Sequence, residues 1–135
     1  MQDTHPSKMP IRLLLVDDEA GFAEVIKKRM AKRGVLVEIA GGGSEAIQLL
    51  RSNDFHVAIL DLKMEDMDGL EVLKIFKKMV PRMPVIMLTG HGSEASAREG
   101  IQLGAFDYLT KPCELEDLLK KISDAAGADH KEDLK

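Results

Sequence analysis

His56-Val57-Ala58-Ile59-Leu60-Asp61 decides the fold, because a run of apolar residues ends there abruptly in a carboxylate. A turn-rich loop, Lys63-Met64-Glu65-Asp66-Met67-Asp68-Gly69, comes directly after Leu62. A short apolar run bounded by turn residues indicates a strand buried on both faces, as in parallel sheets. Open α/β sheets bind their ligands at the carboxyl edge. We therefore expect Asp61 to project into a crevice at that edge.

Length, composition and charge limit the class of protein. The 135 residues suit one domain with a sizeable core, which we place at residues 10–126, between a flexible leader (1–9) and a flexible charged tail (127–135). The net charge of −4 argues against direct binding of nucleic acid. A single cysteine, Cys113, gives no intramolecular disulfide, and neither a signal peptide nor a membrane span is visible. We therefore expect a cytoplasmic protein without membrane contact.

Strand and helix patterns alternate along the chain. Besides the run at 56–60, apolar runs predict strands at 11–16, 35–39, 84–88 and 105–110. Apolar residues at helical spacing follow each strand, in the segments 22–30, 44–50, 69–80, 93–103 and 115–122. Five successive βα units imply a parallel sheet covered by helices on both faces, because right-handed crossovers leave few alternatives. The predicted class is α/β, doubly wound.

The sequence also predicts a helix cap, a weak helix and the role of two loop aspartates. Ser44 is placed to cap the second helix. Segment 93–103 is a weak helix that we expect to be locally mobile, because Gly100 interrupts it and its apolar face is mostly alanine. Asp66 and Asp68 are interpreted as loop or helix-cap residues and not as ligands.

Polar residues stand at the predicted carboxyl ends of four strands: Asp17, Asp18, Asp61, Thr89 and Lys111. Such ends converge on one crevice in a doubly wound sheet. Three carboxylates brought together repel one another and need a cation, and an oxygen-rich site with room for water suits Mg²⁺. With a lysine and a hydroxyl beside them, these residues supply what phosphoryl transfer to a carboxylate requires.

Four segments also resemble the receiver domains of two-component response regulators. They are LLLVDDE at 13–19, AILDLKMEDMDGLEVL at 58–73, PVIMLTG at 84–90 and GAFDYLTKP at 104–112. Each motif alone is common, but the four in this order and at these spacings are highly specific. The resemblance implies the flavodoxin-like fold of chemotaxis regulators, with five parallel strands in the order 2-1-3-4-5.

The resemblance implies a phosphoacceptor and a metal site. Asp61 would accept a phosphoryl group from a phosphohistidine on a sensor histidine kinase or a histidine phosphotransfer protein. Asp18 would bind Mg²⁺ directly and Asp17 through water. The backbone carbonyl of Lys63 would be a further metal ligand.

The resemblance also implies a switch. Thr89 and Lys111 would bond the phosphoryl group, with a cis peptide before Pro112. Tyr108 would turn inward as Thr89 moves, so that the face formed by residues 89–109 controls an unknown output partner or a phosphorylation-dependent homodimer.

This sequence departs from the family pattern at several positions. Glu65 stands where the family usually has proline. Lys63 and His91 lie two residues beyond the phosphoacceptor and the switch threonine, where they would tune the lifetime of the phosphoryl group in a direction that the sequence does not give. Glu19 is expected only to favour the dipole of the first helix.

Two rival functions share part of this pattern. An aspartate-nucleophile phosphatase resembles a strand followed by Asp-x-Asp, whereas Leu62 and Lys63 follow Asp61, and Asp17 and Asp18 are adjacent. A module that binds a flavin phosphate needs a loop rich in Ser, Thr and Gly after the first strand. This chain has three acids there, which would repel the phosphate.

Overall fold

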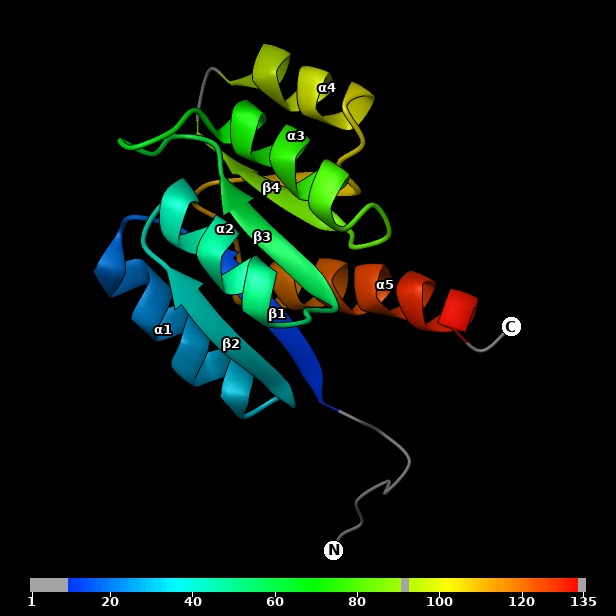
Figure 1. The fold of residues 1–135 in the computed structure, drawn as a ribbon. Coiled ribbons are helices and arrows are strands. Elements are labelled where there is room, and N and C mark those ends of the chain that lie inside the picture. Colours follow the sequence, from blue (N-terminus) through cyan, green and yellow to red (C-terminus); the bar gives the residue numbers. More distant parts are fainter. Residues whose placement is uncertain (1–9, 91–92, 134–135) are drawn as a thin grey trace, which may run out of the picture.

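Five parallel strands form one sheet in the order β2-β1-β3-β4-β5 (Figure 1). The computed structural model describes residues 10–90 and 93–133. Within them the strands are β1 (Ile11–Val16), β2 (Val35–Ala40), β3 (Val57–Asp61), β4 (Val85–Thr89) and β5 (Asp107–Thr110). The predicted α/β class and strand order are therefore confirmed. The expected leader, His91 and the last two residues lie outside the described residues.

The described helices cover both faces of the sheet. They are α1 (Ala20–Ala31), α2 (Gly43–Ser52), α3 (Gly69–Met79), α4 (Glu94–Gln102) and α5 (Leu115–Asp133). Alternate residues of each central strand enter opposite cores, so Leu13 and Ile59 face α1 and α5 while Leu14 and Leu60 face α2 and α3. Burial on both faces explains why these strands read as continuous apolar runs. None of the described helices combines the length and the apolar character of a membrane span.

Helix α5 is longer than the sequence indicates. The domain was expected to end at residue 126, yet the helix continues to Asp133, through most of the expected tail. No proline interrupts residues 115–133, and the alanines at 125 and 126 favour helix. Gly127 costs the helix about 1 kcal/mol relative to alanine, which is too little to end it. Residues 127–133 are therefore helical where a flexible tail was expected, while the domain bounds of 10–126 stay a prediction.

Helix α4 packs on β4 through a glycine. Gly100 is buried, and a Cβ at this position would overlap Sδ of the buried Met87. The glycine that weakens this helix also allows it to approach the sheet closely. The expected mobility of 93–103 stays a prediction.

Candidate functional site

Four strands bring their carboxyl ends to the same edge of the sheet. Asp17 follows β1, Asp61 ends β3, Thr89 ends β4 and Lys111 follows β5. Parallel pairing sets Thr89 beside the last residue of β5, so these ends are level. Among the described residues, the buried polar or charged ones are Asp17, Asp61 and Thr89, and all three belong to this edge. The sheet therefore assembles the predicted strand-end residues into one site.

Three carboxylates form an acidic cluster at this edge. Asp17, Asp18 and Asp61 each offer an oxygen, and these oxygens lie within 4.8 Å of one another. Backbone N–H groups orient two of them: Glu19 donates to Asp17 Oδ1 at 2.9 Å, and Lys63 to Asp61 Oδ1 at 3.1 Å. Burial raises the pKa of Asp61 above its usual value. An all-oxygen donor set with one exposed member is what a hard cation such as Mg²⁺ prefers.

Lys111 supplies the positive charge of the site. Its Nζ lies 3.0 Å from Asp17 Oδ2, 3.5 Å from Asp61 Oδ2 and 2.8 Å from Glu19 Oε1. The peptide bond between Lys111 and Pro112 is cis, as the resemblance implies. Burial acts to lower the pKa of Lys111, but hydrogen bonds to Glu19 and Asp17 outweigh it and raise this pKa above its usual value. Lys111 is therefore a permanent cation beside Asp61.

Glu19 has a contact that the sequence analysis missed. It was expected only to favour the helix dipole, whereas its carboxylate accepts a hydrogen bond from Lys111 and its pKa is lowered for that reason. The two residues are 92 positions apart, so local sequence patterns carry no signal of their pairing.

The two expected switch residues lie in different surroundings. Thr89 is buried, and its hydroxyl donates to the carbonyl of Leu109 on β5 at 3.4 Å. Tyr108 is 39% exposed, and Ile101 and Phe106 are exposed to a similar degree. In this structure Tyr108 is thus a surface residue of β5 and not a member of the acidic site.

Asp66 caps α2 from another loop. Its two carboxylate oxygens accept hydrogen bonds from the backbone N–H groups of Gly43 (3.0 Å) and Ser44 (3.1 Å). These bonds lower the pKa of Asp66. The helix begins at Gly43 and its N-cap residue, Gly42, makes no side-chain cap bond, so the prediction that Ser44 caps it is wrong. The side chain of Asp66 does the capping from 23 residues away.

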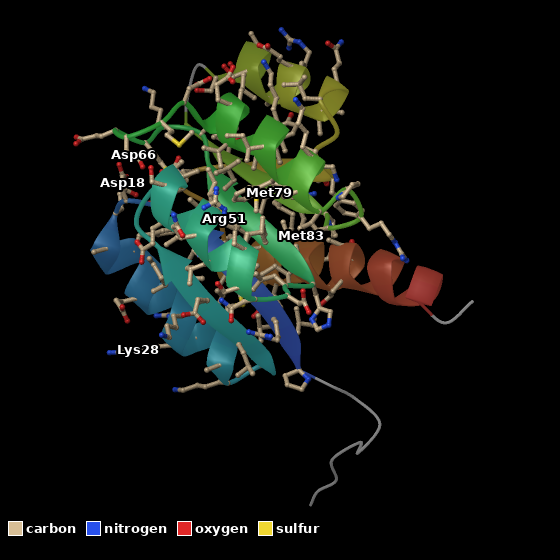
Figure 2. The ribbon with its side chains drawn as sticks, in the orientation of Figure 1. Asp18, Lys28, Arg51, Asp66, Met79 and Met83 are labelled. Carbon is tan, nitrogen blue, oxygen red and sulfur yellow. The ribbon has the colours of Figure 1, made fainter. Side chains whose placement is uncertain are left out.

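The loop after β3 also contacts the acidic cluster directly. The backbone N–H of Glu65 donates to Asp18 Oδ2 at 3.3 Å. In Figure 2 the labelled Asp18 and Asp66 lie near one another beside the first turn of α2. The side chain of Lys63 is exposed, and the role of its carbonyl stays a prediction.

Known proteins are similar to this chain in sequence. The chain is 39% identical over 119 residues to the transcriptional regulatory protein GlrR of Escherichia coli K12. The aligned residues make up 88% of this chain and 27% of GlrR. It is 36% identical over 114 residues to the response regulator MprA of Mycobacterium sp. KMS, and the aligned residues make up 84% of this chain and 50% of MprA. The chain therefore spans between about a quarter and half of the length of these relatives.

Solved structures agree with the sequence relatives. A CheY-like receiver domain protein from Methanospirillum hungatei superposes with a TM-score of 0.87 at 33% identity, covering 93% of this chain and 99% of that one. The receiver domain of a LuxO repressor protein from Vibrio parahaemolyticus superposes with a TM-score of 0.87 at 32% identity, covering 93% of this chain and 97% of that one. The family model of the response regulator receiver domain matches residues 13–123. The chain therefore belongs to the receiver domains of response regulators, the signalling switches of two-component systems.

Proposed function

We propose that this receiver accepts a phosphoryl group on Asp61 from a phosphohistidine of a sensor histidine kinase or a histidine phosphotransfer protein. The observation that carries the proposal is the position of Lys111. Its Nζ reaches both buried carboxylates, Asp17 and Asp61, in a cluster that also presents the exposed Asp18 to solvent. This is the arrangement of a nucleophile, a fixed cation and a place for a metal that phosphoryl transfer requires.

Each group has a definite task in this reaction. An oxygen of Asp61 attacks phosphorus as the bond from phosphorus to the imidazole nitrogen breaks. The other nitrogen of the phosphohistidine ring carries a proton, so the histidine leaves as a neutral imidazole and Asp61 becomes an acyl phosphate. Mg²⁺ would be held by Asp17, Asp18, Asp61 and the carbonyl of Lys63, and it would neutralise charge on the transferred oxygens. Lys111 balances the negative charge that the acyl phosphate adds. Water then hydrolyses the acyl phosphate, so the domain resets itself.

The switch acts through contacts that exist only after phosphorylation. Thr89 bonds the carbonyl of Leu109 at 3.4 Å, a long hydrogen bond that a phosphoryl oxygen can replace. Once Thr89 has moved, Tyr108, which is an exposed residue of β5 in this structure, would turn inward. The face of residues 89–109 thereby changes shape for an output partner or a second copy of the chain. We place the protein in the cytoplasm, where kinases and nucleotides are available.

Intact mass spectrometry tests the proposal. The wild-type protein is incubated with a small-molecule phosphodonor, with Mg²⁺ or with EDTA, beside Asp61→Asn and the matched control Asp68→Asn. We expect a gain of one phosphoryl group in wild type and in Asp68→Asn that needs Mg²⁺, decays with time and is lost in Asp61→Asn. A folded wild-type protein that binds Mg²⁺ but gains no mass would overturn the proposal and leave a receiver-like docking module.

Variants of the switch residues test the second step. Thr89→Ala and Tyr108→Ala should still gain the phosphoryl group but lose any phosphorylation-dependent self-association, measured by light scattering, or partner binding. If both variants respond to phosphorylation as wild type does, the switch does not run through Thr89 and Tyr108.

A further inference from the structure

Hydrogen bonds fix the loop from Leu62 to Asp68 at two places, the acidic cluster and the start of α2. On one side the N–H of Lys63 bonds Asp61, and the N–H of Glu65 bonds Asp18. On the other side Asp66 bonds the first two N–H groups of α2. A loop of this length without such bonds would be free to change its path. The cap on α2 is therefore a fixed point for the loop that lies over the acidic cluster.

The first turn of α2 is shaped to receive Asp66. A Cβ at Gly42 would lie 2.8 Å from both carboxylate oxygens of Asp66, so any larger residue would displace that side chain. The φ angle of Gly42 is −175°, an extended conformation that any residue adopts. A side chain at Gly42 is therefore disfavoured by the presence of Asp66 and not by the backbone.

Glu65 connects this cap to the metal site. Proline, which the family usually carries at this position, has no N–H and could not donate to Asp18. Here the Glu65 N–H does donate to Asp18 Oδ2, at 3.3 Å. Asp66 is the next residue, so its cap also holds the backbone of Glu65 in place. That short backbone segment orients both the Lys63 carbonyl and, through the Glu65 N–H, one oxygen of Asp18.

We infer that Asp66 is a positioning residue for the Mg²⁺ site, because its cap on α2 fixes the loop that carries the Lys63 carbonyl and bonds Asp18. The inference rests on the proposed function for the identity of the metal and of the carbonyl ligand. Groups that orient metal ligands commonly change metal affinity when removed, by about 10–100-fold. Two hydrogen bonds, one partly buried and one exposed, act here only through a loop and should give the low end, about tenfold.

The experiment measures the Mg²⁺ dissociation constant of the unphosphorylated protein by titration calorimetry. Two substitutions break the cap in different ways. Asp66→Ala removes the carboxylate, and Gly42→Ala displaces it while every charge of the chain is kept. The matched control is Gly41→Ala, whose Cβ would lie 3.5 Å from Glu45 Oε1, an ordinary contact. Asp66→Asn is the intermediate variant, because asparagine has one acceptor oxygen and can accept from only one of the two N–H groups.

We expect the dissociation constant to rise about tenfold in Asp66→Ala and in Gly42→Ala, and to change less than twofold in Gly41→Ala. Asp66→Asn keeps one of the two cap bonds, so its dissociation constant should lie between those of wild type and Asp66→Ala. Gly42→Ala should have no further effect in the Asp66→Ala background, since the carboxylate that it displaces is absent. In both cap variants, phosphorylation should slow at low Mg²⁺ and recover at saturating Mg²⁺. Because Mg²⁺ also stabilises a weakened fold, circular dichroism should show that both variants are folded without the metal.

The outcomes separate this inference from the proposed function. Equal affinity in wild type and in both cap variants overturns the inference alone. An equal loss in Asp66→Asn and Asp66→Ala with no loss in Gly42→Ala overturns it too, because charge and not the cap would then matter. If Asp66→Ala does not fold, Gly42→Ala against Gly41→Ala decides. A wild-type protein without Mg²⁺ binding overturns the proposed function itself.

Discussion

Asp61→Asn should stabilise the protein when no divalent metal is present. Asp61 is 6% exposed and shares its site with two further carboxylates whose oxygens lie within 4.8 Å. Asparagine has the same shape, and its carbonyl oxygen can keep the hydrogen bond that Lys63 N–H donates to Asp61. The substitution therefore removes a buried charge and little else.

The size of the effect follows from the distances. At an effective dielectric constant of about 20, two like charges 4.8 Å apart repel by about 3.5 kcal/mol, and a lysine at 3.5 Å attracts by about 4.7 kcal/mol. Asp17 contributes this repulsion in full, and the exposed Asp18 roughly half of it because solvent screens its charge. Repulsion and attraction therefore nearly cancel, to within about 1 kcal/mol. Burial, the largest cause of the raised pKa of Asp61, adds to the cost. We expect the variant to be more stable by about 1–2 kcal/mol.

Urea unfolding followed by circular dichroism measures this difference, since the chain has no tryptophan. In EDTA at pH 7.5 the variant should unfold at higher urea. Because the folded-state pKa of Asp61 is raised, wild type regains stability as the pH falls through that pKa, and the gap between the two proteins should close.

Mg²⁺ should reverse the order. At a concentration 100 times its dissociation constant it stabilises wild type by about 2.7 kcal/mol, and the variant, which lacks one ligand, by less. An Asp61→Asn variant less stable than wild type in EDTA at pH 7.5 would refute the reasoning. Lys111 would then more than compensate the buried carboxylate.

Two further predictions concern glycines. Gly69→Ala should lower the free energy of unfolding by about 1–3 kcal/mol, because its Cβ would lie 2.5 Å from Cα of Leu62. Gly21→Ala in α1 should raise it by up to about 1 kcal/mol, because its Cβ would meet nothing within 4 Å. Equal effects of the two substitutions in urea unfolding would contradict this. Gly100→Ala should lower the thermal midpoint in wild type, because Met87 fills the space, and raise it in a Met87→Ala background, where about 1 kcal/mol of helix propensity remains. The same sign in both backgrounds would show that Met87 is not the cause.

The fold was accessible from sequence because burial on both faces leaves a strong signal. The runs ending at Val16, Asp61 and Thr89 are almost entirely apolar, and each either ends in a polar residue or is followed directly by one, at the same edge of the sheet. The positions of Asp17, Asp61, Thr89 and Lys111 at strand ends could therefore be predicted together. Local pattern alone sufficed for these features.

Contacts between loops could not be predicted in the same way. Glu19 bonds Lys111, and Asp66 bonds Gly43, across 92 and 23 residues respectively. Ser44 is a residue type that commonly caps helices, but here the Asp66 carboxylate, from another loop, accepts the hydrogen bonds of the first turn. The end of α5 was placed too early because a charged segment was interpreted as a tail, although its composition also suits an exposed helix.

The packing of the site determines which part of the sheet responds to charge. Of the four strands whose ends build the site, β1, β3 and β4 are paired on both sides, and β3 and β4 are buried throughout. β5 lies at the edge of the sheet, alternates between half-buried and exposed residues, and carries both Tyr108 and the connection to Lys111. Asp17 and Asp61 are therefore held by elements that cannot shift without opening the core, whereas Lys111 and Tyr108 belong to the least constrained element. If Asp61 is phosphorylated as proposed, we expect the added negative charge to shift Lys111 and the exposed side of β5 more readily than the buried strands.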